Sequence, residues 1–194
     1  MNTRLLFVFL FLCALSSGFS EPSDKEIIAV MNKVERGVAA GNASALNDLL
    51  TLPPEWAVPA FLTVFKENYL IYGATPTNRA IGEKCAQLAT SVPANEEVFA
   101  KILNIKMDNG DPSLQQVYAV KCLICAHNKF SVRVLGGALD APTTSGRAAN
   151  ALATMGLPGA PYASKDKGVA SNAKGIAQWK DWWKSNSTNY SGSN

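Results

Sequence analysis

The sequence has little excess charge of either sign and only one histidine. Its 194 residues include 18 Lys and Arg against 15 Asp and Glu, so the formal net charge is +3. Nucleic-acid-binding proteins are usually strongly basic, and this chain is close to neutral, so we predict no nucleic-acid partner. A single histidine leaves little acid–base chemistry near neutral pH. The sequence contains no P-loop, H-E-x-x-H or G-x-S-x-G motif, so we expect no enzymatic activity and no cofactor.

Long apolar segments are also absent, except for one near the N-terminus. Residues 5–15 are apolar, they follow Arg4, and small residues separate them from Glu21. A basic start, an apolar middle and a small-residue end are typical of a secretory signal peptide. The apolar run is shorter than the ~20 residues that a helix needs to span a bilayer. We predict a signal peptide over residues 1–20, cleavage after Ser20, a periplasmic or secreted mature chain, and no stable membrane insertion after cleavage.

Most of the mature chain has apolar residues at helical spacing. Ile27, Met31, Val34 and Val38 lie on one helical face, after an S-x-x-E capping pattern that begins at Ser23. Gly and Pro residues divide the following segments from one another. The expected helices cover about 23–40, 42–52, 59–72, 77–90, 95–107, 112–127, 130–135, 145–156 and 173–184.

Two of these helices need comment. The alternation of apolar and polar residues over 130–135 also fits a strand, but the helical neighbours favour a short helix. For the helix over 112–127, we expect Asp111 to cap the N-terminus and Pro112 to occupy the first helical position.

The C-terminal part has less periodicity. Residues 157–172 are rich in Gly, Pro, Ser and Lys and predict a long loop, and the polar residues 186–194 predict a disordered tail. Between them, residues 173–185 place Trp179 and Trp183 on one face and predict a Trp-rich closing helix. Trp182 points elsewhere on that helix, so it is the candidate for an exposed aromatic that binds a ligand.

Short stretches of sequence also repeat. Lys84-Cys85 and Lys121-Cys122 stand 37 positions apart, and the Ala-rich stretch 147–152 is similar to a third copy. A period near this value is typical of helix-pair repeats. Together with the Asp111-Pro112 helix start and the Trp-rich end, these features make residues 23–156 resemble the HEAT-repeat or armadillo-like class. The resemblance implies an all-α fold, a short superhelix of stacked helix pairs, and a scaffold that binds another protein without catalytic residues.

Three cysteines remain after signal cleavage, and their role stays open. Cys85 and Cys122 hold equivalent repeat positions, so in an oxidising compartment they are the candidate disulfide pair. With Cys125 and His127 they would instead form a Cys3His zinc site, which defines the alternative function of a metal- or redox-linked exported module. The C-x-x-C-H haem motif is interrupted by Ala126. The third interpretation is that the cysteines are small core residues between stacked helices.

Overall fold

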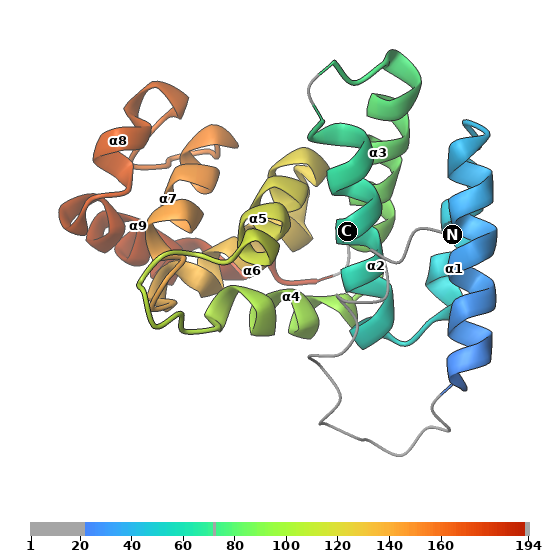
Figure 1. Ribbon diagram of the computed structural model, residues 1–194. Coiled ribbons are helices and arrows are strands. Elements are labelled where there is room, and N and C mark those ends of the chain that lie inside the picture. Colours follow the sequence, from blue (N-terminus) through green and yellow to red (C-terminus); the bar gives the residue numbers. More distant parts are fainter. Residues whose placement is uncertain (1–21, 72, 193–194) are drawn as a thin grey trace.

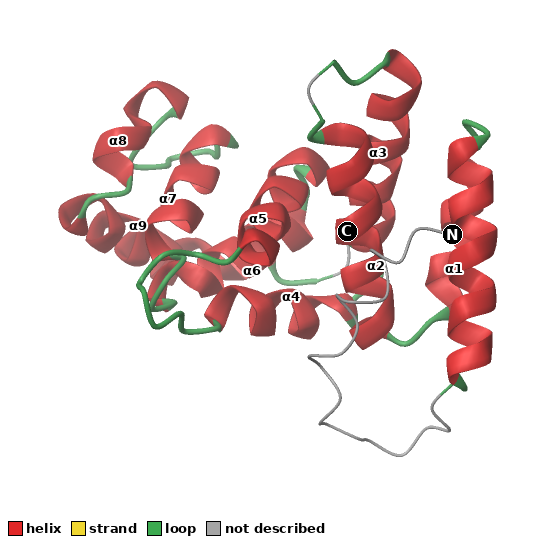
Figure 2. Cartoon of the chain, in the orientation of Figure 1, coloured by secondary structure: helices red, strands yellow, loops and turns green. Residues whose placement is uncertain are grey.

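The computed structural model describes residues 22–71 and 73–192. In this part of the chain all regular structure is helical and no strand is present, so the prediction of an all-α fold is confirmed (Figures 1 and 2). The predicted signal peptide lies outside the described residues. The α-helices are α1 (Asp24–Ala39), α2 (Pro54–Tyr69), α3 (Pro76–Ala89), α4 (Asn95–Asn104), α5 (Leu114–Ala126), α6 (Lys129–Gly137), α7 (Ser145–Thr154), α8 (Lys167–Ala170) and α9 (Ala173–Asn186). Shorter 3-10 helices are η2 (Ala43–Thr51), η3 (Ala138–Asp140), η4 (Ser164–Asp166) and η5 (Ser187–Tyr190).

Consecutive helices pack as pairs, α2 on α3, α4 on α5 and α6 on α7. Alternate helices also pack side by side, since α2 contacts α4 and α4 contacts α6, while α3 contacts α5 and α5 contacts α7. The core lies between these two sets of helices. Its largest fully buried side chains include Phe61, Phe65, Phe99, Phe130 and Leu123. At one end of this arrangement lie α1 and η2, and at the other end lie α8 and α9 (Figure 1).

Several helices start at a side-chain cap, as the example of α1 shows. Its predicted capping box is present: the Glu26 N–H donates to Ser23 Oγ (3.4 Å) and the Ser23 N–H donates to Glu26 Oε2 (2.8 Å). The prediction for α5 was wrong, because this helix begins after Ser113 and not at Asp111-Pro112. Ser113 and Gln116 form a second capping box, which satisfies two backbone N–H groups at the start of the helix.

Helix α2 also begins earlier than predicted. It starts at Pro54, because a proline fits the first helical turn, where a missing N–H costs nothing. Pro59, the predicted start, lies inside the helix. The predicted helix over 130–135 is confirmed as part of α6.

The segment 157–172 is not the continuous loop that its composition predicts. It contains η4 and α8. The Asp166 carboxylate accepts a hydrogen bond from the Ala163 N–H at 3.1 Å, and Ala170 is fully buried. Leu157 also packs against the core, and α8 packs on α7 and α9. Tertiary contacts therefore order a segment that has no helical period.

The tail differs from its prediction as well. Residues 186–192, expected to be disordered, end α9 and form η5. Arg133 of α6 binds this segment, since its Nη1 donates to the carbonyl of Tyr190 (2.8 Å) and to that of Gly192 (2.7 Å). Its Nε donates to the Glu96 carboxylate at 2.9 Å. These contacts come from α4 and α6, far away in the sequence, so composition alone could not indicate them.

Candidate functional site

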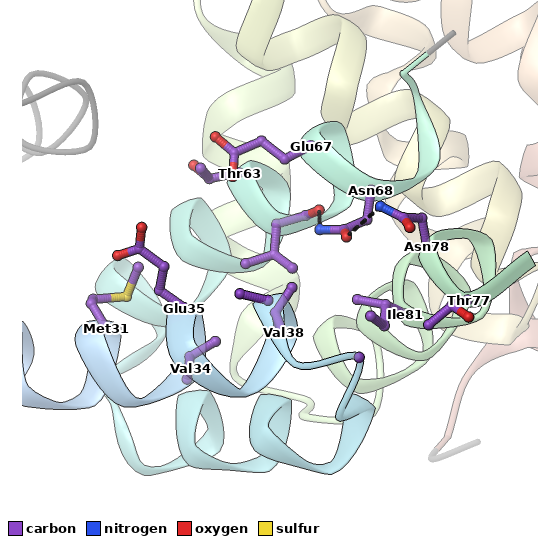
Figure 3. Close-up of a pocket in the computed structure, with 13 residues that line it drawn as sticks. Met31, Val34, Glu35, Val38, Thr63, Glu67, Asn68, Thr77, Asn78 and Ile81 are labelled. Atoms are coloured by element: carbon purple, nitrogen blue, oxygen red, sulfur yellow. Dashed lines mark hydrogen bonds between the residues drawn. The ribbon is translucent and has the colours of Figure 1, made fainter. Parts of the chain in front are cut away.

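A groove of ≈ 380 Å³ lies between α1, α2 and the first turns of α3 (Figure 3). It exists because α1 packs on η2, and η2 in turn packs on α2 and α3. Gly37 of α1 makes the first contact very close, since a Cβ added there would lie only 2.3 Å from the Cβ of Ala45. Helix α1 is therefore held against η2 and leaves a gap beside α2.

The floor of the groove is apolar. It is formed by Met31, Val34 and Val38 of α1, Val64 of α2 and Ile81 of α3. Met31, Val34, Val64 and Ile81 are each at most 8% exposed, and Val38 is half-buried. The apolar stripe that predicts the first helix therefore has two uses, because it covers η2 and also lines this groove.

Acidic residues stand on both sides of the groove. Glu35 comes from α1 and Glu67 from α2, and both are exposed (Figure 3). Among the described residues, neither carboxylate forms a salt bridge, whereas the neighbouring Lys33 is paired with Asp48 at 2.9 Å. No basic residue of the described chain lines the groove. The mouth of the groove therefore carries two uncompensated negative charges.

An amide network forms the end of the groove next to α3. Asn68 is buried and donates through Nδ2 to the carbonyl of Val64 at 2.9 Å. Asn78 Nδ2 donates to Asn68 Oδ1 at 3.3 Å, and the Thr75 hydroxyl donates to Asn78 Oδ1 at 2.5 Å. The chain of hydrogen bonds joins α2 to the start of α3 (Figure 3). This end of the groove is therefore held in place without an occupant.

The three described cysteines lie where α2, α3 and α5 meet, and all of them have free thiols. Cys85 and Cys122 are fully buried, and the Cys85 thiol donates to the carbonyl of Phe61 at 2.9 Å. Burial is the first cause that raises the pKa of each of these two thiols well above its usual value. Burial also raises the pKa of the half-buried Cys125, while a hydrogen bond with Tyr69 opposes that rise. The burial of Cys85 and Cys122 matches their interpretation as small core residues.

The sequence also predicts two more specific roles for these cysteines, a disulfide and a zinc site. The structure holds Cys85 and Cys122 as thiols, not as the predicted disulfide, and thiol counting on the denatured, unreduced protein tests that pairing. The Cys3His site is not assembled: no three His, Cys, Asp or Glu side chains of the described chain are placed to hold a metal ion. His127 is exposed and ends α5 in a left-handed conformation with φ 48°. The turn that ends the helix therefore separates the imidazole from the buried thiols.

The raised thiol pKa values predict a stability that depends on alkaline pH. An unfolded cysteine has a pKa of ~8.5. Since the folded values are higher, the native state keeps protons that the unfolded state releases. This contribution is complete below pH ~8.5 and is lost as the pH rises through the folded values. We expect urea melts under reducing conditions to show that the free energy of unfolding falls between pH ~7.5 and pH ~9.5. The fall should be about 1–3 kcal/mol larger than the fall in the double variant C85A/C122A over the same range. Equal losses of unfolding free energy in the two proteins would contradict this prediction.

The prediction for Trp182 was wrong, because this side chain is buried and not exposed. Its ring meets Trp179 edge to face, with the centroids 5.3 Å apart, and Tyr190 lies 6.0 Å away. Trp183, predicted to face the core, is the half-buried one, and it packs flat against the chain at Gly136, where an added Cβ would lie 2.4 Å from the ring. The folded-back η5 covers Trp182, so helical spacing alone could not identify the more exposed ring.

No sequence motif marked the groove. The only feature of the sequence that relates to the groove is the apolar stripe of the first helix. No pattern in the sequence indicates that a space remains between this stripe and α2.

None of the helices in the described part of the chain is both long enough and apolar enough to cross a membrane. Comparison with known protein families, curated proteins and solved structures finds no match to this chain.

Proposed function

We propose that this chain is an exported, non-enzymatic module of the HEAT-repeat or armadillo-like class that binds another protein. The observation that supports it is the packing of alternate helices. In a stack of helix pairs, each first helix contacts the first helix of the next pair, and each second helix contacts the next second helix. The contacts of α2 with α4 and of α4 with α6 follow this rule, and so do those of α3 with α5 and of α5 with α7.

The two ends of the chain fit the same proposal. Stacked repeats need terminal elements that cover the last exposed apolar faces. Helix α9 packs on α6 and α7 and inserts the fully buried Trp179. At the other end, η2 packs on α2 and α3. The resemblance provides no catalytic residues, and the two fully buried thiols are poorly placed for metal or redox chemistry. Binding by surface complementarity on a rigid stack is the mechanism that remains.

The proposal predicts a mature, partnered protein in the exported fraction of the native source. We expect affinity purification to yield a chain that begins at Glu21 and carries one protein partner in near-stoichiometric amount. Calorimetry with the two purified proteins should then give a defined stoichiometry without added metal. A chain that keeps residues 1–20 would contradict export by a cleaved signal. A chain recovered without any partner would contradict the scaffold, and stoichiometric zinc would favour the metal-linked alternative.

A further inference from the structure

We infer that the groove between α1 and α2 receives the apolar face of an amphipathic, basic helical segment of a partner protein. This inference rests on the proposed function and names the chemistry of the partner. Its first support is the pattern of helix contacts. Helix α2 packs against α4, and α4 packs against α6, but α1 is held on η2 instead of closing on α2. The groove is thus the place in the row of first helices where the side-by-side contact is replaced by a gap.

Two contacts set the positions of the helices on the two sides of the gap. The near contact between Gly37 and Ala45 fixes how close α1 lies to η2. The Asn68–Asn78 hydrogen bond fixes α2 against α3 on the other side. Val34 and Val64 line this space but are already almost fully buried, whereas half-buried Val38 and exposed Ala39 still present apolar surface to it. An apolar side chain from outside would remove this surface from water, which is the main favourable term in helix-in-groove recognition.

The shape of the apolar surface favours an occupant that runs along α1. Ile28 is 48% exposed and lies three residues before Met31, so it continues the same face of α1 beyond the groove. A segment that places one apolar residue in the groove and another one turn away can cover both features. This spacing of three or four residues is that of an amphipathic helix.

Charge selects which amphipathic helix binds. Glu35 and Glu67 stand on the two sides of the groove, and within the described chain no cation pairs with either carboxylate. A partner with Lys or Arg beside its apolar residues supplies the missing charge, and a partner with Asp or Glu there is repelled. Exposed ion pairs add little affinity each, so the apolar contact determines strength while the two glutamates determine specificity.

Selection from a displayed library of random peptides tests this inference without knowledge of the native partner. With the mature chain as bait, we expect enriched peptides to share apolar residues at a spacing of three or four and Lys or Arg within one turn of them. With the E35Q/E67Q variant as bait, the apolar spacing should persist and the preference for Lys and Arg should disappear. Failure to enrich any peptides, or enrichment of peptides without basic residues by the unchanged chain, would overturn the inference.

Two tryptophan variants locate the binding site. Ala39 lines the groove and is exposed, so Ala39→Trp should fill the groove and weaken binding of an enriched peptide at least tenfold. Ala29→Trp is the matched control, because Ala29 is exposed on the same helix but is not part of the groove lining. Both variants should unfold at the temperature of the unchanged chain. If Ala39→Trp binds the peptide as well as Ala29→Trp does, the groove is not the site. If the native partner also binds Ala39→Trp normally, the protein-binding function stands and only the inference about the groove fails.

Discussion

Replacement of Trp179 by Ala is expected to lower the free energy of unfolding by about 3–5 kcal/mol, which is the range for a fully buried Trp truncated to Ala. Trp179 has no exposed surface and is the largest of the fully buried side chains. Its ring also contacts Trp182 edge to face. Because α9 packs on α6 and α7, the cavity would open at the end of the last helix pair. Urea unfolding followed by circular dichroism measures the change.

Two further variants show whether the loss comes from packing. Lys174→Ala alters an exposed position of the same helix and should change the free energy of unfolding by less than ~0.5 kcal/mol. Trp179→Phe should cost less than half as much as Trp179→Ala. The reason is that Trp179 Nε1 is buried without a hydrogen-bond partner in the described chain, so its removal loses no bond. A Trp179→Ala variant as stable as Lys174→Ala would show that Trp179 does not anchor α9 on α6 and α7.

Replacement of Gly82 by Val should separate α2 from α3 and cost about 2–4 kcal/mol of unfolding free energy. A Cβ at position 82 would lie 2.5 Å from the Cβ of Tyr69 and 3.2 Å from its Cα. The obstacle includes backbone, which cannot turn aside as a flexible side chain does, so the helices themselves must move. The same urea melts measure the loss.

The matched control for this change is Ala80→Val. Ala80 is exposed on α3, so this variant pays only the lower helix propensity of Val, below ~1 kcal/mol. Movement of Tyr69 should also weaken its hydrogen bond with Cys125. That hydrogen bond lowers the pKa of the Cys125 thiol, so its loss leaves less of the reactive thiolate. We therefore expect a thiol reagent to modify Cys125 more slowly in Gly82→Val than in Ala80→Val. Equal stabilities and equal labelling rates in the two variants would contradict this account of the α2–α3 contact.

The structure of single helices follows closely from local sequence. The capping box at Ser23 and the apolar stripe from Ile27 to Val38 predict α1 almost to the residue, because capping and helical spacing act over only a few positions. The misplaced starts of α2 and α5 arise from the same local rules. Pro54 suits a first helical turn, and Ser113 with Gln116 forms a capping box like the one that begins α1.

The burial of individual side chains does not follow from local sequence alone. Trp182 is covered because η5 folds back over α9, and η5 is itself held by Arg133 of α6. His127 is separated from Cys122 and Cys125 by the turn that ends α5. The burial of Trp182 depends on contacts between different elements, and the position of His127 depends on the conformation of one residue. Neither property produces a periodic pattern in the sequence.

The sequence by itself thus determined that the described chain is helical, where most of its helices lie, and which faces of them are apolar. Those properties depend on contacts within a few residues of chain. Only the tertiary structure decided that the apolar face of α1 is shared between η2 and an open groove, and that Glu35 and Glu67 lie on the two sides of that groove. The physical reason is that the angle and distance between two helices depend on close contacts such as that of Gly37 with Ala45. Such contacts join separate elements, and the free energy that selects them belongs to the packed chain as a whole.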